Sequence, residues 1–413
     1  MSDISLANGV PANAVGDRQS IEVDVDHHGP EFRDHVYEVF DDLRGRCPVA
    51  HSSAHDGFWM LTDYETVFAA TRDDDAFSSA ASVAVPGSPF PFPILPIETD
   101  PPETQQLRAV TLGPFSPKAA KNLRPMMREI ATDLIDQFIE RGECDIVAEF
   151  ATPMPARVML RMLDFDESRY LEWVDRVHLS VHERAHDPET AIMAGASMLN
   201  ELAEEMDKRR DRPADADLFS RIVHGELDGE PLDEVQISMY GMLMMLGGMD
   251  TTSGLTGNAL LQLCEHPELR QQLIDDPSLL TSATEEFLRH DTPTLGLGRT
   301  TTRDVEIGGC VIPEGEKVLL MWAAANRDPA IFENPDEIDF SRENRKHLSF
   351  GVGAHRCLGS NLAREMFKVM LEEMLRRLPD FDLAGEPVRY EDAAEVYGLS
   401  SLPIRFTPGT RSS

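Results

Sequence analysis

The sequence predicts a mainly α-helical protein with small β-sheets, an α+β fold. Long amphipathic patterns dominate residues 118–289. Within them, residues 235–265 are apolar on nearly all sides, as in a helix buried in the core of a large domain. Residues 299–319 alternate between apolar and polar positions around glycine turns, which predicts paired strands.

The elements before and after this helical region follow from local patterns. Residues 1–20 are small and polar, so we predict a disordered tail, followed by a single domain over residues 21–413. Helical spacing predicts a helix over residues 32–43, and the apolar run 58–62 predicts a strand. The proline-rich stretch 81–98 cannot form a regular helix. Residues 397–404 predict a terminal strand pair.

Composition excludes several classes of partner. The chain has 413 residues, 41% of them hydrophobic, and a net charge of -35, which argues against nucleic acid or an anionic membrane as partner. Its five cysteines are scattered without a C-x-x-C pair, which is typical of a reducing cytoplasm. No secretion signal is apparent, and no apolar run approaches the roughly 20 residues that span a bilayer. We therefore expect a cytoplasmic protein.

The stretch 348–364 places a cysteine where a glycine-rich loop meets a helix. Apolar residues recur at helical spacing after Cys357, so the sulfur lies near a helix N-terminus, where unpaired N–H groups stabilise an anion. Gly351 and Gly353 permit turns that other residues avoid, and Gly359 permits close approach of something flat and bulky. We interpret Cys357 as a metal-bound thiolate; the alternative is a structural cysteine in a turn.

A second unusual stretch lies inside the apolar helix. Gly247 and Gly248 precede Asp250 and Thr251. A buried carboxylate and hydroxyl are costly, and each glycine weakens a helix by roughly 1 kcal/mol. Function would offset these costs; the alternative is a glycine-kinked core helix with Thr251 bonded back to a carbonyl.

These motifs together resemble a known family. Phe350-x-x-Gly353-x-x-x-Cys357-x-Gly359 matches the haem-binding signature of the cytochrome P-450 family. The resemblance implies the P-450 fold, with a long oxygen-binding helix over haem b. It makes Cys357 the axial iron ligand. The remaining residues at the cofactor by resemblance are Gly247, Gly248, Phe350, Gly351, His355 and Gly359.

The resemblance also implies which residues take part in catalysis, contact the haem propionates and form the structural triad. Thr251 would hydrogen-bond bound dioxygen, and Asp250 would relay protons to it. Arg108, Arg299 and His355 would contact the haem propionates, although Thr104 and Leu297 replace polar contacts that many members have. The family's structural triad maps to Glu286, Arg289 and Arg342.

The substrate pocket is expected to be apolar. The loop 81–98 stands where the family has the loop that roofs the pocket, and its alternative role is a rigid surface loop. The turn near Leu399 usually touches substrate in the family. Candidate pocket residues are Phe90, Phe92, Leu95, Leu243, Leu246, Leu295, Leu297 and Leu399.

The resemblance implies a monomeric haem-thiolate monooxygenase acting on a terpenoid, a branched fatty acid or a similar small lipid. No flavin or iron–sulfur signature occurs, so electrons would come from a ferredoxin and its NAD(P)H-dependent reductase. Basic positions flank the haem motifs and either dock the acidic ferredoxin or form an ordinary solvated face: Arg108, Lys118, Lys121, Arg124, Arg128, Arg345, Lys346 and Arg364.

Three other interpretations remain. A peroxide-driven peroxygenase would share the thiolate but usually has an arginine-containing motif in place of the acid and alcohol. A haem-based sensor or ligand carrier would need no proton relay. Separately, His178, His182 and His186 stand at i, i+4 and i+8 and could bind a metal on one helix face.

Overall fold

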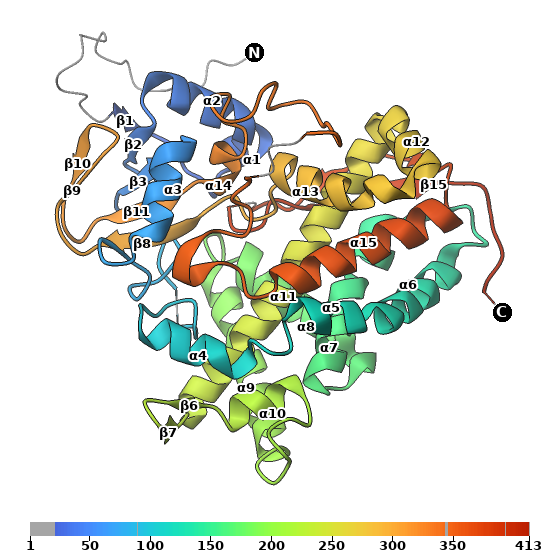
Figure 1. Cartoon of the computed structure of the whole chain (residues 1–413), viewed down its shortest axis with the longest axis horizontal. Helices are drawn as coiled ribbons and strands as arrows, with labels where there is room; N and C mark the ends of the chain where they lie inside the picture. Colours follow the sequence, from blue (N-terminus) through green and yellow to red (C-terminus); the bar gives the residue numbers. More distant parts are fainter. Residues whose placement is uncertain (1–20, 89, 343–345, 393, 413) are drawn as a thin grey trace.

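The computed structural model describes residues 21–88, 90–342, 346–392 and 394–412. The predicted tail and Arg345 lie outside the described residues. The described chain is a large helical region with a smaller region of sheet beside it (Figure 1). The predicted α+β class is confirmed.

The centre of the helical region is α11 (Glu234–Glu265), which runs through the middle of the molecule in Figure 1. Its N-terminus is fixed by a capping box, in which Asp233 and Gln236 each accept a hydrogen bond from the other's backbone N–H. The helix is unbroken across Gly247 and Gly248. The buried helix that the sequence predicts is confirmed within one residue at its start.

Other helices surround α11. Those of the helical region are α4 (Glu103–Thr111), α5 (Pro117–Asn122), α6 (Arg124–Phe138), α7 (Pro153–Leu163), α8 (Tyr170–His182), α9 (Pro188–Asp207), α10 (Leu218–Val223), α12 (Pro267–Asp275), α13 (Leu280–His290) and α15 (Ser360–Arg377). Shorter helices accompany the sheet: α1 (Pro30–Asp34), α2 (Val36–Arg46), α3 (Tyr64–Arg72) and α14 (Trp322–Ala325). No described helix combines the length and the apolarity that crossing a bilayer requires.

The main sheet has six strands in the order β1-β2-β3-β11-β8-β4. Their bounds are β1 (Ile21–Val23), β2 (Val49–Ser52), β3 (Phe58–Leu61), β11 (Lys317–Leu320), β8 (Leu297–Thr301) and β4 (Phe77–Ser78). β11 pairs antiparallel with β8, and Val318 lies opposite Arg299. This register fixes the position of Arg299 within a buried strand.

Small strand groups complete the fold. The pairs are β9 (Val305–Ile307) with β10 (Cys310–Ile312), β6 (Glu226–Leu227) with β7 (Glu230–Pro231), and β13 (Val388–Arg389) with β14 (Leu399–Ser401); β15 (Pro403–Arg405) lies between β12 (Asp382–Leu383) and β5 (Glu143–Asp145). The predicted terminal strand pair is therefore wrong, because β14 and β15 join different sheets. The predicted helix over residues 32–43 is likewise divided at His35 into α1 and α2.

Candidate active site

A cavity of about 240 Å³ lies between α11 and the loop that carries Cys357, the cysteine loop. From α11 it is lined by Leu243, Met244, Gly247, Gly248, Thr251, Thr252 and Leu255. From the cysteine loop and α15 it is lined by Ser349, Phe350, His355, Cys357, Leu358, Gly359, Leu362, Ala363 and Met366. The two stretches that the sequence singled out thus face one another across an enclosed space.

The cysteine loop is held by backbone contacts. The N–H of Cys357 donates to the carbonyl of Phe350 at 2.8 Å, and this bond closes the loop. Gly353 has φ +77° and lies against the backbone of Thr71, where a Cβ would be 3.1 Å from the carbonyl oxygen. α15 begins at Ser360, three residues after the cysteine. The loop therefore presents the sulfur to the cavity from a fixed backbone.

The Cys357 thiol is accessible from the cavity although protein surrounds it. Burial raises the pKa of this thiol above its ordinary value, while the N–H of Gly359 and the guanidinium of Arg108 oppose that shift only in part. The proximity to a helix N-terminus is thus not enough to keep the thiol ionised. A bound metal deprotonates a coordinating thiol outright.

Two arginines and a neutral histidine lie near the cavity, and among the described residues none of the three pairs with a carboxylate. Arg299 is 2% exposed, and burial lowers its pKa to about 10. Among the described residues neither Arg299 nor Arg108 forms an ion pair with a carboxylate; Arg108 Nη2 donates to the Arg356 carbonyl at 2.6 Å. His355 Nε2 is buried without a hydrogen-bond partner, and burial, Arg299 and Arg108 lower the pKa of His355 to about 4. This cluster fits the two propionate groups of haem b.

The flat part of a haem also fits the site. A Cβ built on Gly247 has open space around it, and one on Gly359 meets only the Cys357 sulfur, at 3.9 Å. Both glycines therefore expose backbone to the cavity from opposite walls. Thr104 does not reach the cavity, because its hydroxyl donates to the Thr99 carbonyl at 2.7 Å. Leu297 does line the cavity, as an apolar contact.

Thr251 lines the cavity, and its hydroxyl donates to the Gly247 carbonyl at 3.0 Å. This is the local bond that the alternative interpretation predicted, yet the same oxygen keeps a lone pair for a ligand in the cavity. The helix is continuous across Gly247 and Gly248. Gly248 admits Met159 of α7, since a Cβ there would lie 2.8 Å from its Sδ.

Asp250 does not line the cavity. It is 1% exposed and turns toward α8, where its oxygens lie 2.9 Å from His182 Nε2 and 3.3 Å from His178 Nε2. Burial alone would raise the pKa of Asp250, but the two imidazoles hold that pKa well below its usual range. The Tyr390 ring stacks on His182 with centroids 3.9 Å apart. Asp250 is thus a buried ionised group outside the cavity, next to Thr251 in the chain.

The possible metal face of His178, His182 and His186 is not formed among the described residues. The helix ends at His182, so His186 lies beyond it. His178 and His182 share the Asp250 carboxylate instead. Their spacing of four residues signalled a common face, but nothing in the sequence identified the partner.

Of the candidate pocket residues, Leu243 and Leu297 line the cavity. The others lie elsewhere in the described structure. Phe90 packs against α9, where a Cβ on Gly195 would overlap its ring, and Phe92 is 49% exposed. The remaining four are occupied by core packing: Leu95, Leu246, Leu295 and Leu399.

The pocket residues that sequence analysis missed come from separate elements. They are Pro96, Ile97, Phe115, Met159, Leu288, Pro293, Thr294 and Trp322. Pro96 and Ile97 do belong to the loop 81–98, so that loop contributes its last residues and not its aromatic ones. The others carry no local signal that separates them from core residues.

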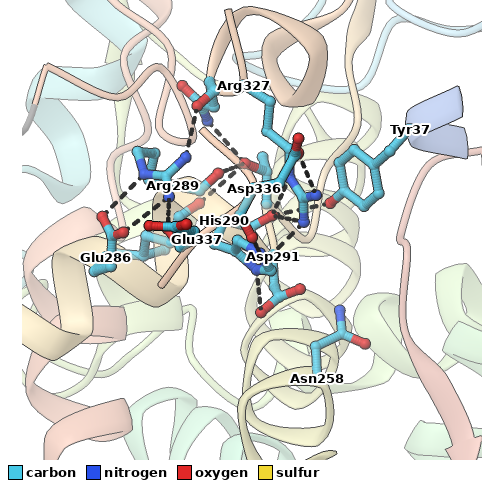
Figure 2. Close-up of polar contacts among 12 residues, drawn as sticks. Tyr37, Asn258, Glu286, Arg289, His290, Asp291, Arg327, Asp336 and Glu337 are labelled. Atoms are coloured by element: carbon cyan, nitrogen blue, oxygen red, sulfur yellow. Dashed lines mark hydrogen bonds and ion pairs between the residues drawn. The ribbon is translucent and has the colours of Figure 1, made fainter. Parts of the chain in front are cut away.

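The three residues of the expected triad meet in the structure. Both oxygens of Glu286 accept from Arg289, at 2.8 and 2.9 Å, and Arg342 Nε lies 3.1 Å from Glu286. Figure 2 shows Arg289 between Glu286 and the loop that carries Glu337. Arg289 also donates to the carbonyls of Asn326, Pro335 and Glu337. The triad thereby holds the segment that leads to the cysteine loop.

The basic positions divide into two groups. Arg124 and Arg128 form ion pairs with Glu365, Glu372 and Glu373 of α15, so they are structural. Arg364 is likewise paired, with Glu285, and lies over the Phe350 ring. These three arginines are already paired with carboxylates of the chain, whereas Lys118, Lys121 and Lys346 are exposed.

Comparison with known proteins gives consistent matches. The family model described as "Cytochrome P450" matches residues 156–389. Cytochrome P450 107B1 of Saccharopolyspora erythraea is 34% identical over 84% of this chain and 89% of its own length. A steroid C26-monooxygenase of Mycolicibacterium smegmatis is 33% identical over 90% of this chain and 92% of its own. The structure of a P450 EryK mutant with erythromycin B has a TM-score of 0.84 and 29% identity, covering 93% of this chain and 99% of its own.

Proposed function

Because this chain belongs to the cytochrome P450 family and is a haem-binding monooxygenase, we propose that it hydroxylates a small hydrophobic substrate with electrons from a ferredoxin and its reductase. Haem b supplies the chemistry that places one atom of O₂ in a C–H bond and reduces the other to water. The observation that carries the proposal is the cavity shared by Cys357 and Thr251.

In this proposal the chain's own residues first hold the cofactor. Cys357 is the iron ligand, held by the backbone bond to Phe350. Arg108, Arg299 and His355 receive the propionates, which supply the negative charge that these buried groups lack. Burial of an unpaired guanidinium is costly, so loading the cofactor should stabilise the fold.

Proton delivery falls to α11 and α8. The Thr251 hydroxyl lines the cavity and can pass a proton when its O–H donates to a ligand there instead of to the Gly247 carbonyl. Asp250 is the adjacent ionised group; it is hydrogen-bonded to His182 and lies 3.3 Å from His178 Nε2. Enclosure of the cavity by apolar side chains limits water, which favours product formation over release of peroxide.

The substrate class follows from the lining. Apart from a few polar groups such as Thr251, Thr252 and Thr294, the cavity is lined mainly by apolar side chains. Leu243, Leu297 and Met159 are examples. One relative is named a steroid C26-monooxygenase, which supports a hydrophobic substrate for this chain as well. We place the substrate among terpenoids, branched fatty acids and similar lipids.

Two experiments test the proposal. The reduced protein with carbon monoxide should show the strongly red-shifted Soret band of a thiolate-bound haem, and Cys357→Ser should lose it. A screen of terpenoids and fatty acids should then find ligands that shift the haem iron from low spin to high spin, because a fitting ligand expels water from the iron. A Soret band that survives Cys357→Ser would overturn the ligand assignment.

The Asp250–Thr251 pair also favours a monooxygenase driven by O₂ over the peroxygenase. A peroxygenase or a ligand carrier would show no product coupled to NADH in the presence of a ferredoxin pair. Product formed only with added hydrogen peroxide would support the peroxygenase. Ligand binding without any product would support the carrier.

A further inference from the structure

Away from the cavity, three histidines lie close together beside β1 and β2, at one edge of the main sheet. His27 and His28 lie between β1 and α1, and His55 lies in the turn between β2 and β3. One nitrogen atom of each ring lies within 4.8 Å of one nitrogen atom of each of the other two. Within the described parts of the chain, no other set of three histidine, cysteine or carboxylate side chains is gathered this closely. His27 is 5% exposed and His28 is 2% exposed.

The hydrogen bonds of His27 leave a buried lone pair unused. Its Nε2 lies 2.9 Å from the Val85 carbonyl, an acceptor, so the proton of the neutral ring resides on Nε2. Its Nδ1 is buried without any hydrogen-bond partner. A neutral, unprotonated ring nitrogen is the form that binds a metal ion.

His55 has the same arrangement. Its Nε2 lies 2.7 Å from Asp26 Oδ1, and the carboxylate fixes the proton on that nitrogen. Nδ1 is then the unprotonated nitrogen. A carboxylate or carbonyl on one ring nitrogen is the usual companion of a histidine that binds metal through the other. Both His27 and His55 therefore have the outer partner that a metal site needs.

His28 has oxygen partners on both nitrogens. Nδ1 lies 2.8 Å from Asp392 Oδ2, and Nε2 lies 2.6 Å from the Val85 carbonyl. Two acceptors require both ring protons, and His28 is then a cation beside two other imidazoles, with the His27 centroid 4.1 Å away. Metal binding would replace the Nε2 proton and leave Asp392 as the partner of Nδ1, releasing one proton.

We propose that His27, His28 and His55 form a binding site for a zinc ion. Imidazole nitrogens are preferred zinc ligands, and a tetrahedral ion with Zn–N distances of about 2.0–2.1 Å separates its ligands by about 3.3 Å. Closing the cluster to that spacing requires side-chain shifts on the order of 1 Å. Three protein ligands leave the fourth position to water. A purely structural histidine cluster would leave the buried Nδ1 of His27 unexplained.

The site would join segments that are distant in the sequence. His28 contacts Asp392, whose backbone carbonyl in turn accepts from His182 Nδ1 at 2.7 Å. Zinc would thus fasten the N-terminal segment to the loop that supports α8. Its expected effect is on stability, because a ligand that binds only the folded state raises the melting temperature.

The test uses the full-length haem-loaded protein, so that Cys357 is not a free thiol. After treatment with EDTA and dialysis against excess zinc followed by zinc-free buffer, elemental analysis should find one zinc per haem, and the melting temperature should rise. His55→Gln should lose the zinc and the shift. His55 is the least buried of the three, so this variant should fold, and an unchanged carbon monoxide spectrum verifies that it does.

His51→Gln is the matched control. His51 lies on neighbouring β2 and pairs with Glu22 at 2.8 Å, outside the cluster. This variant should retain one zinc per haem. Failure of the unsubstituted protein to retain zinc would overturn the proposal, as would full retention by His55→Gln or loss by His51→Gln.

Discussion

At the scale of single residues, Thr251 and Thr252 are the hydroxyl side chains of α11 that line the cavity, and we propose Thr251 as the proton donor. We expect Thr251→Ala to keep consuming NADH while product per NADH falls about tenfold and hydrogen peroxide rises, because loss of a positioned proton donor costs roughly 10²–10⁴ in the step that it serves. Peroxide and product assays in parallel measure this partition. Thr256→Ala is the control, since Thr256 donates to the Thr252 carbonyl within the same helix and does not line the cavity. Equal uncoupling in both variants would contradict the role of Thr251.

A second prediction for a single residue concerns His182 and the pH dependence of the unfolding free energy. Burial disfavours its charged form, but the Asp250 charge and the bonds to Asp250 and Asp392 outweigh burial and raise the pKa of His182. Its stabilising effect is therefore complete below its unfolded pKa of about 6.5 and is lost as pH rises through the higher folded value. The groups that face it are Asp250, Asp392, Tyr390 and His178.

His182→Gln should thus reduce the fall in unfolding free energy above about pH 6.5, the unfolded pKa, and should cost about 3–5 kcal/mol below it, as for a broken buried pair. Denaturant titrations across this pH range measure both effects. A residual slope should remain, because Asp392 also raises the pKa of His28 against the effect of burial. His266→Gln, at an exposed position, should leave the slope unchanged. A slope that is the same in all three proteins would exclude His182 as its source.

At the scale of elements, the contact of α11 with α7 depends on Gly248. A Cβ there would lie 2.8 Å from Met159 Cγ and Sδ, so Gly248→Ala should push that flexible side chain into the cavity. We expect about tenfold weaker binding of a ligand that induces the spin shift, with stability changed by less than about 1 kcal/mol because alanine favours the helix. Adding Met159→Ala should restore binding. No coupling between the two changes in the double-mutant cycle would show that the contact does not shape the cavity.

The sequence predicted those parts of the site in which the functional residues are adjacent or nearly adjacent in the chain. Cys357 and its glycines, and the Asp250–Thr251 pair, are of this kind. The pocket was largely missed because its walls come from α7, α13, loops and strands, where Met159 or Leu288 resembles any core residue. The partners of Asp250 were missed for the same reason. His178 and His182 stand about seventy residues away, and only the packing of α8 on α11 brings them together.

At the scale of the whole molecule, a net charge of -35 makes exposed cations near the cysteine loop significant for docking an acidic ferredoxin. α5 packs against α15, and Asn361 at the start of α15 donates to the Phe115 carbonyl just before α5. The exposed Lys118 and Lys121 of α5 therefore lie beside the helix that follows Cys357. Arg124 and Arg128 cannot serve equally, because glutamates of α15 already neutralise them.

Reversing both lysines, Lys118→Glu with Lys121→Glu, should slow ferredoxin-dependent reduction about tenfold at low salt, since steering by surface charge changes association rates by factors of 10–10³. The difference should shrink as ionic strength rises, because the Debye length falls to about 8 Å at 0.15 M. Lys208→Glu changes an exposed lysine at the end of α9 and should leave the rate unchanged. Stopped-flow reduction of the haem at several salt concentrations measures the effect. Equal rates for all three proteins at low salt would place the electron donor elsewhere on the surface, whereas a loss that persists at high salt would indicate damage to the fold around α5.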